Sequence, residues 1–265
     1  MALRLVAVAQ AAGFAIREIY HSVEAGVVIT KEDNSPLTKA DLAANKVICE
    51  ALSQHYPDIP IISEENQQIE FSQRKNYPRF FLVDPLDGTK EFIKRNGEFT
   101  VNIALIEGDR PVLGVVYAPE LDQMYVGEQG QGSWRWDQKW TQIQARDQLV
   151  QPADLIASAS HMTSLTKSFI QRWPQVQLTQ AGSSLKFIKV AIGECDCYPR
   201  MVPCMEWDTA AADIIVQEAG GLIDRYNDQG QFSGEHLKYN KENLLSPFFV
   251  VWANTQVKNY YAGLV

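Results

Sequence analysis

Two aspartates stand three residues apart where an apolar segment ends, in the stretch FLVDPLDGTKEF at residues 81–92. An earlier segment, DIPIISEEN at residues 58–66, also ends in adjacent acids, Glu64 and Glu65. If strands in the two segments are neighbours, these carboxylates converge at one rim of a sheet. Two carboxylates about 4 Å apart repel by roughly 4 kcal/mol at an effective dielectric constant of about 20. Such a cluster needs a cation, and oxygen ligands select hard ions such as Mg²⁺ over Zn²⁺.

The turn inside the first motif favours a ligand site at the same place. Pro85 restricts Asp84 to extended backbone, so the carboxylates can point to one side. Gly88 lets the backbone approach a ligand closely, and Thr89 can cap a short helix whose free N–H groups face an anion. Acidic ligands beside such a helix start are typical of metal-assisted phosphoryl chemistry. An Asx-type turn with Asp87 as an ordinary N-cap explains this motif alone equally well.

A third acidic position lies in CMEWDTAAADIIVQEAGG, residues 204–221. Asp208 stands where a helix is expected to begin, and the alanines at 210–212 would let that helix pack closely against another backbone. Asp208 could also serve only as a cap for that helix. Together with the two earlier motifs, it favours a metal centre.

The elements that hold these residues begin with two predicted helices. Apolar residues at helical spacing within residues 1–22 indicate an amphipathic helix rather than a signal peptide, because Gln10 and Gly13 interrupt any continuous apolar run. A short strand follows at residues 27–31. Thr38 is the expected N-cap of a helix from Lys39 to about His55, whose apolar stripe would consist of Leu42, Val47, Ile48 and Leu52.

The rest of the chain divides into two patterns. Residues 100–136 form successive strand-like runs broken by turn signals, which predicts an antiparallel meander. From about residue 150, strands and helices alternate. We therefore expect an α+β N-terminal half at residues 1–145 and an α/β C-terminal half at residues 146–265.

Composition narrows the class of function. A formal net charge of −8 and a pI near 5.1 argue against broad nucleic-acid binding. The four cysteines, Cys49, Cys195, Cys197 and Cys204, are too few for a disulfide framework and lack the spacing of a standard zinc site. No segment reaches the length of a membrane span. These features predict a cytoplasmic, reduced protein; peripheral attachment to the inner face of the inner membrane and the oligomeric state stay open.

The three acidic motifs resemble, in order, the signature segments of the inositol monophosphatase superfamily of Mg²⁺-dependent, lithium-sensitive phosphatases. The likeness is closest to its bacterial 3′(2′),5′-bisphosphate nucleotidases, through DNSPLTKAD, GVVYAP and GSSLKF, and it runs nearly end to end. One departure is Ala212, where the signature usually has glycine; we expect little effect, since the residue is still small. The resemblance implies an α/β fold built as a layered αβαβα sandwich.

The resemblance also implies roles for individual residues. One metal ion would be held by Glu64, Asp84 and the carbonyl of Leu86, and a second by Asp84, Asp87 and Asp208, with two or three Mg²⁺ ions in all. Glu65 and Thr89 would orient or deprotonate the attacking water. Asp41 matches a position for acid/base or metal-support work, although a solvated acid in the first turn of a helix explains it equally well.

A second phosphate on the substrate would need donors and cations away from the metal ions. Ser183, Ser184 and Lys186 of GSSLKF form one candidate anion site, and Tyr198 and Arg200 offer base stacking and phosphate binding. On sequence grounds alone Lys186 and Arg200 could equally be solvated surface charges, with Lys90, Lys94 and Arg95 as the next candidates. The resemblance adds further substrate contacts from Glu64, Leu86, Asp87, Gly88, Thr89 and Asp208.

The resemblance predicts an enzyme that removes the 3′-phosphate of adenosine 3′,5′-bisphosphate to give AMP, and also acts on 3′-phosphoadenylyl sulfate, in sulfate assimilation. Its substrate is a small phosphorylated nucleotide rather than a nucleic acid. An inositol monophosphatase or a related sugar phosphatase would share every metal ligand. A non-catalytic nucleotide or cation sensor on the same scaffold is an alternative of another class.

Overall fold

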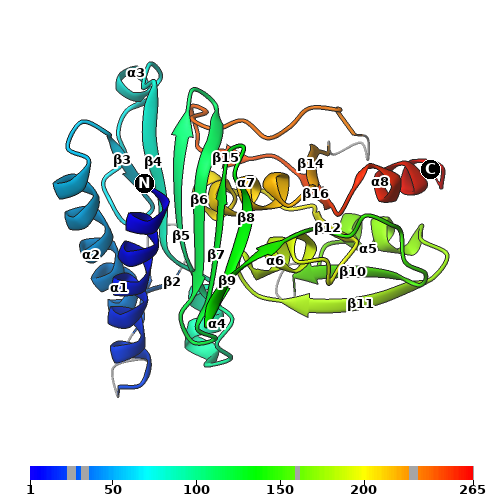
Figure 1. The fold of residues 1–265 in the computed structure, drawn as a ribbon, viewed down its shortest axis with the longest axis horizontal. Helices are drawn as coiled ribbons and strands as arrows, with labels where there is room; N and C mark the ends of the chain where they lie inside the picture. Colours follow the sequence, from blue (N-terminus) through cyan, green and yellow to red (C-terminus); the bar gives the residue numbers. More distant parts are fainter. Residues whose placement is uncertain (23–27, 31–35, 159–161, 227–231, 265) are drawn as a thin grey trace.

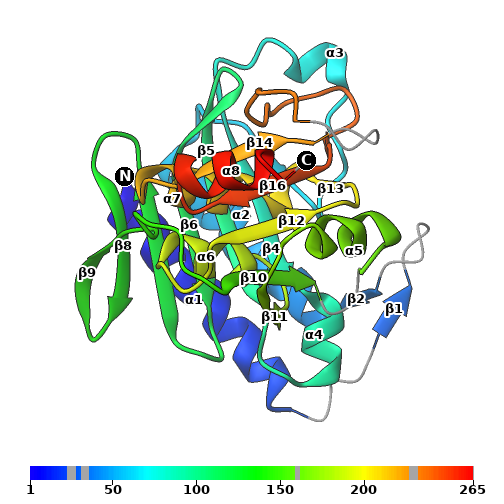
Figure 2. The ribbon, with the colours of Figure 1, turned by 90° about the vertical axis from the view of Figure 1, so that its right-hand side faces the viewer.

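The computed structural model describes residues 1–265 except 23–27, 31–35, 159–161, 227–231 and 265. Helices and sheets alternate in layers across the molecule (Figure 1). Two helices cover the outer face of a seven-stranded sheet, two more lie between this sheet and a five-stranded one, and a last pair covers the far side (Figures 1 and 2). The expected αβαβα sandwich is therefore confirmed.

The outer helices are α1 (Ala2–Tyr20) and α2 (Lys39–His55). Thr38 caps α2 as predicted, since its hydroxyl accepts a hydrogen bond from the Ala40 N–H while the Asp41 side chain accepts one from the Thr38 N–H. The predicted apolar stripe of α2 is wrong at Leu42, which is 43% exposed. Ala40 and Ala44 are buried instead, because they share one face of the helix with Ile48 and Leu52 at intervals of four residues.

The seven-stranded sheet has the order β3-β4-β5-β6-β7-β8-β9. Its strands are β3 (Ile61–Ser63), β4 (Arg79–Asp87), β5 (Thr100–Glu107), β6 (Arg110–Ala118), β7 (Gln123–Glu128), β8 (Gly132–Asp137) and β9 (Lys139–Ile143). Only β3 and β4 pair in parallel, so the predicted meander from residue 100 is confirmed and extended by β9. The parallel pair places Ser63, at the end of β3, opposite Val83, directly before Asp84 in β4.

Shorter elements flank this sheet. They are the paired strands β1 (Val28–Thr30) and β2 (Pro36–Thr38), and the helices α3 (Phe71–Arg74) and α4 (Thr89–Lys94). β1 corresponds to the strand predicted at 27–31, of which residues 27 and 31 lie outside the described part of the chain.

Helix α7 (Ala210–Glu218) packs directly on the inner face of this sheet. A methyl group built on Gly114 would lie 2.2 Å from the Ala211 carbonyl oxygen, and one on Gly127 would lie 2.7 Å from the Ile215 Cα atom. The close packing expected from the alanine run therefore exists, and it depends on glycines in the opposing strands β6 and β7. Helix α6 (Leu185–Ala191) lies beside α7 in the same layer.

The second sheet has the order β11-β10-β12-β16-β14. Its strands are β10 (Ala153–Ser158), β11 (Val176–Ala181), β12 (Cys197–Arg200), β14 (Leu222–Arg225) and β16 (Phe249–Trp252). The outer helices are α5 (Ser164–Gln171) and α8 (Thr255–Ala262). A small separate pair consists of β13 (Cys204–Met205) and β15 (Leu245–Ser246). The alternation of strands and helices predicted from about residue 150 is confirmed.

Two apolar cores lie on the two faces of the first sheet. Strands of the first sheet come from residues 61–143 and those of the second from 153–252. The division at residue 145 stays a prediction, because α7 belongs to the C-terminal part yet packs on the N-terminal sheet. None of the described helices has the length and apolar character to cross a membrane.

Candidate active site

The DPLD motif lies inside a strand rather than after one. β4 continues to Asp87, with Asp84 opposite Asn102 and Asp87 opposite Thr100, and the register shifts between the two aspartates. The expectation that the apolar segment ends where the two aspartates begin is therefore wrong. Within the bulge, the Leu86 N–H donates to Asp84 Oδ1 at 3.0 Å, which is an Asx-type turn, but the N-cap of the following helix is Gly88 and not Asp87 as that alternative required. The turn and the acidic site coexist, because the bulge brings both aspartates to one side.

Asp208 approaches the same point from the C-terminal part. It is the last residue of the 3₁₀ turn η2 (Glu206–Asp208), and its Oδ2 accepts a hydrogen bond from the Met205 N–H at 3.1 Å. One carboxylate oxygen from each of Asp84, Asp87 and Asp208 lies within 4.8 Å of the others. Three carboxylates from two separate segments of the chain therefore form a group that could hold a metal ion.

Electrostatics indicate that this group is built for a cation. Burial raises the pKa of Asp84 well above its usual range, and the carboxylates of Glu64, Asp87 and Asp208 raise it further. Burial also raises the pKa of Asp208 in the same way, with Asp87 and Glu64 adding to it. A hard cation bound among these oxygens would remove the repulsion.

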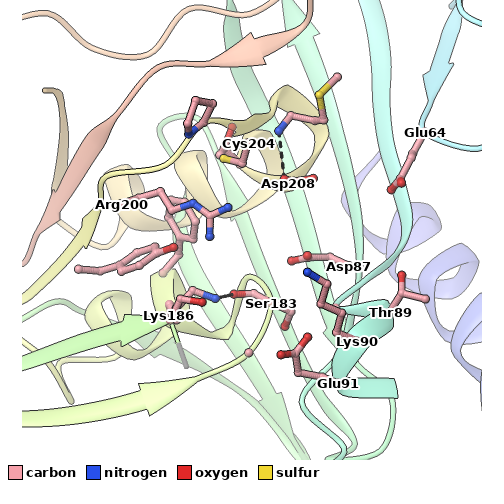
Figure 3. A pocket seen from close by; sticks show the side chains of 18 of the residues that line it. Glu64, Asp87, Thr89, Lys90, Glu91, Ser183, Lys186, Arg200, Cys204 and Asp208 are labelled. Atoms are coloured by element: carbon pink, nitrogen blue, oxygen red, sulfur yellow. Dashed lines mark hydrogen bonds between the residues drawn. The ribbon is translucent and has the colours of Figure 1, made fainter. Parts of the chain in front are cut away.

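Glu64 and Glu65 occupy the turn after β3. The Glu64 N–H donates to the Val83 carbonyl at 3.1 Å, which fixes Glu64 beside the residue that precedes Asp84. Figure 3 shows the Glu64 side chain facing the same space as Asp87 and Asp208. Glu65 is half-buried and is not among the residues that line this cavity. Its role in catalysis stays a prediction.

The side chains of Thr89 and Asp41 contact each other near the acidic group. Thr89 Oγ1 lies 3.2 Å from Asp41 Oδ1 and 3.4 Å from the Leu86 carbonyl oxygen. Thr89 is the first residue of α4, whose N-cap is Gly88 with φ of +93°, so the expectation that Thr89 caps this helix is wrong. Asp41 is 2% exposed and therefore not a solvated acid. Burial raises its pKa, although hydrogen bonds from Thr38 oppose the shift.

These residues open onto a cavity of about 350 Å³ (Figure 3). Of the predicted site residues, those that line it are Glu64, Asp87, Gly88, Thr89, Ser183, Lys186, Tyr198, Arg200 and Asp208, together with Lys90 from the further candidates for phosphate binding. Asp84 and Leu86 lie beneath its floor, each 2% exposed. Cys204, which sequence analysis treated as incidental, also lines the cavity, and burial raises the pKa of its thiol to about 12.

Lys186 and Arg200 lie on the side of the cavity opposite Glu64 and Thr89 (Figure 3). Lys186 is 4% exposed, which excludes a solvated surface charge, and burial lowers its pKa to about 8. Its ammonium nitrogen lies 5.5 Å from the ring centroid of Tyr198. Tyr198 itself is 2% exposed, packed among Phe187 and Phe249, which leaves little of its ring for stacking on a base. The cavity thus has an acidic side and a cationic side.

The adjacent serines of GSSLKF face opposite ways. Ser183 adopts a left-handed backbone (φ of +44°), and its buried hydroxyl has no hydrogen-bond partner among the described residues. Ser184 is 1% exposed and does not line the cavity, and its hydroxyl lies 3.0 Å from Asp87 Oδ2. Direct substrate binding by the Ser184 side chain, as predicted, does not agree with this placement.

Thr100 and Asn102 were not predicted as site residues, yet they are buried in β5 opposite Asp87 and Asp84. Asn102 Nδ2 donates to Ser184 Oγ at 2.9 Å. A signal was present in TVNIALIE, where two polar residues at i and i+2 share one face of an otherwise apolar strand. The cysteines that invited a zinc interpretation are free thiols, and in the described part of the chain they do not gather into a group that could hold a metal ion.

Known proteins with similar sequences agree with the family resemblance of the three acidic motifs. Residues 2–256 match the model of the inositol monophosphatase family. The 3′(2′),5′-bisphosphate nucleotidase CysQ of Escherichia coli (strain K12) is 43% identical over 247 residues, which are 92% of this chain and 96% of that protein.

Solved structures agree with the fold. The crystal structure of CysQ from Bacteroides thetaiotaomicron superposes with a TM-score of 0.82 at 36% identity, covering 95% of this chain and 96% of that one. The extragenic suppressor protein suhB from Bartonella henselae gives 0.79 at 24% identity, covering 98% of this chain and 96% of that one, and supports the fold alone.

Proposed function

The chain belongs to the inositol monophosphatase family, and on that basis we propose that it is a Mg²⁺-dependent phosphatase that removes the 3′-phosphate of adenosine 3′,5′-bisphosphate. The products are AMP and inorganic phosphate, and one water molecule is consumed. The same site accepts 3′-phosphoadenylyl sulfate, which carries its second anionic group at the same end, and the reaction serves sulfate assimilation. The observation that carries this proposal is the acidic group on one side of the cavity and the cations Lys186 and Arg200 on the other.

In this proposal the acidic side holds the 3′-phosphate. Asp84, Asp87, Asp208, Glu64 and the Leu86 carbonyl are the oxygens that would hold two or three Mg²⁺ ions. The bound ions supply Lewis-acid activation of water and neutralise charge on the phosphate. The donor set fits them, since it consists of carboxylate and carbonyl oxygens.

Thr89 and Asp41 carry out the proton transfer. The Thr89 hydroxyl orients the attacking water and passes the proton of that water on to Asp41 Oδ1, which lies 3.2 Å from Thr89 Oγ1. The pKa of Asp41, which burial raises, makes its carboxylate a better proton acceptor than an exposed aspartate. A cation sensor would have no use for a hydroxyl at the cavity paired with a buried carboxylate, so the contact favours an enzyme.

Lys186 and Arg200 select the nucleotide over inositol phosphate. Inositol 1-phosphate has one phosphate, which the acidic side already holds. A second phosphate on the substrate would meet the buried Lys186 and the half-buried Arg200 on the far side, where a charge-assisted hydrogen bond contributes about 1.5–3 kcal/mol. Ser183, with its unpartnered hydroxyl, is the neutral donor on that side.

Comparing the hydrolysis of adenosine 3′,5′-bisphosphate and inositol 1-phosphate tests this proposal. We expect kcat/KM to favour the nucleotide by at least about ten-fold, since each 1.4 kcal/mol corresponds to that factor. The Asp84→Asn variant is the control for contaminating phosphatase and should lose turnover of both substrates. Preference for inositol 1-phosphate would support the sugar-phosphatase alternative, and turnover of neither would support the sensor.

A further inference from the structure

The Ser184 hydroxyl touches both segments that carry the acidic group. Its oxygen lies 3.0 Å from Asp87 Oδ2, at the end of β4, and 2.9 Å from the main-chain carbonyl oxygen of Asp208, at the end of η2. The side chain is buried beneath the cavity floor, outside the set of residues that line it. Ser184 therefore connects two segments that are far apart in the sequence but adjacent at the site.

Two further side chains fix the direction of this hydroxyl. Thr100 Oγ1 donates to Asn102 Oδ1 at 3.0 Å, which orients the amide so that its NH₂ group donates to Ser184 Oγ at 2.9 Å. With its oxygen accepting from Asn102, the Ser184 hydroxyl has a single proton, which it shares between Asp87 Oδ2 and the Asp208 carbonyl oxygen. All three residues are at most 1% exposed, so water does not compete for these hydrogen bonds.

The acidic residues are held in different ways. Asp84 Oδ1 accepts from the Leu86 N–H, and Asp208 Oδ2 accepts from the Met205 N–H, so both depend on the main chain. Asp87 Oδ2 accepts from the Ser184 side chain. A carboxylate held at one oxygen presents its other oxygen in a fixed direction. Asp87 is therefore the member of this group whose orientation can be changed by a side-chain substitution.

We propose that Ser184, oriented by Asn102 and Thr100, is a positioning residue that fixes Asp87 and the end of η2 and thereby sets the affinity of the site for its cation. The inference rests on the proposed function in that it takes Mg²⁺ as this cation. Without the hydroxyl, Asp87 can rotate away from Asp84 and Asp208, and the site must be reassembled each time a cation binds. The affinity for the cation then falls, while the groups that carry out the chemistry stay in place.

The test is Mg²⁺ binding by the Ser184→Ala variant, measured by titration calorimetry on the whole protein without substrate. We expect the affinity for Mg²⁺ to fall by about ten-fold, because the free energy of a hydrogen bond to a charged group corresponds to a change of about that size. The Mg²⁺ concentration for half-maximal hydrolysis should rise by about the same factor, and saturating Mg²⁺ should restore kcat to within about two-fold. Ser183→Ala is the matched control: it should raise KM for the nucleotide and leave Mg²⁺ binding unchanged.

Unchanged Mg²⁺ affinity in Ser184→Ala would overturn the inference, and so would a loss of turnover that saturating Mg²⁺ does not restore. If Ser184→Ala does not fold, as judged by thermal unfolding in chelator, Thr100→Val decides. This variant keeps the shape of the side chain and removes only the hydroxyl that orients Asn102. We expect a two- to three-fold loss of Mg²⁺ affinity, which corresponds to about half the free energy of a neutral hydrogen bond. No loss in Thr100→Val would then overturn the inference.

Calorimetry separates this inference from the proposed function. Should the nucleotide not be hydrolysed while Ser184→Ala weakens Mg²⁺ binding, the substrate assignment fails and the positioning role stands. Should the nucleotide be hydrolysed normally by Ser184→Ala at low Mg²⁺, the positioning role fails and the proposed function stands.

Discussion

Thr89 Oγ1 lies 3.2 Å from Asp41 Oδ1, although the two residues are 48 positions apart in the sequence. The other oxygen of Asp41 accepts hydrogen bonds from the N–H and the hydroxyl of Thr38, at 2.8 and 2.6 Å. The capping box of α2 therefore does two things. It starts the helix, and it points the free oxygen of a buried carboxylate at the threonine beside the acidic group.

Replacing Thr89 by alanine should slow the chemical step while sparing the metal site. We expect kcat to fall by about a hundred-fold or more, because a positioned proton-transfer group typically contributes that much. Mg²⁺ affinity, measured by calorimetry, should stay within about two-fold, since the hydroxyl is not a primary ligand. Thr89→Ser keeps the hydroxyl and should recover most of the activity. A variant whose main defect is weak Mg²⁺ binding would contradict this role.

Lys186 should determine the affinity for the second phosphate. Lys186→Gln should raise KM for adenosine 3′,5′-bisphosphate by about ten-fold or more and barely change the kinetics of a small monophosphate substrate. Lys189→Gln is the matched control, because Lys189 lies on the same helix but outside the cavity, paired with Glu194. Equal losses on both substrates would mean that Lys186 serves the fold or the metal site instead.

The same lysine should make substrate binding depend on pH. Burial lowers the pKa of Lys186 to about 8, so in the free enzyme the ammonium loses its proton and its charge as the pH rises through that value. We expect the ratio of kcat/KM for the nucleotide to kcat/KM for a monophosphate to fall between about pH 7.5 and 9. In Lys186→Gln this fall should be absent. A ratio that is flat across this range in the parent protein would show that the charge of Lys186 is not used.

Gly114 should matter for stability, because α7 approaches β6 too closely there for any side chain. A methyl group would lie 2.2 Å from the Ala211 carbonyl oxygen, so Gly114→Ala must push the helix outward. We expect a loss of about 1–3 kcal/mol in the free energy of unfolding, measured with urea. Gly263→Ala is the control, since its new methyl group would stay 3.4 Å from the nearest atom at an ordinary φ. Similar stability in both variants would contradict the close packing.

Local signals predicted much of this molecule. Thr38 followed by a helix-forming segment specified the start and end of α2, and turn residues between apolar runs specified the meander. Local signals did not predict the bulge that carries β4 through Asp87, since a bulge depends on the partner strand. They also could not separate Ser183 from Ser184, because the direction of each hydroxyl follows from the left-handed backbone of Ser183 and from Asn102 on another strand.

The residues of the candidate site also differ in how strongly local sequence signals predicted them. Acidic motifs identified Asp84, Asp87 and Asp208, and the structure brings these three together. Thr100 and Asn102 gave only a faint signal, as polar residues in an apolar strand, and their place beneath the acidic group is set by the register of β4 and β5. Cys204 gave no signal at all, because only the path of the chain after β12 brings it into the cavity.

Phosphorus NMR of the products formed from adenosine 3′,5′-bisphosphate shows directly which phosphate the enzyme removes. We expect inorganic phosphate and AMP that keeps its 5′-phosphate; their formation should require Mg²⁺, be suppressed by Li⁺ and be abolished in excess chelator. Loss of the 5′-phosphate would contradict the placement of the two phosphates at the acidic and cationic sides of the cavity. Full turnover in excess chelator would contradict the metal-dependent mechanism itself.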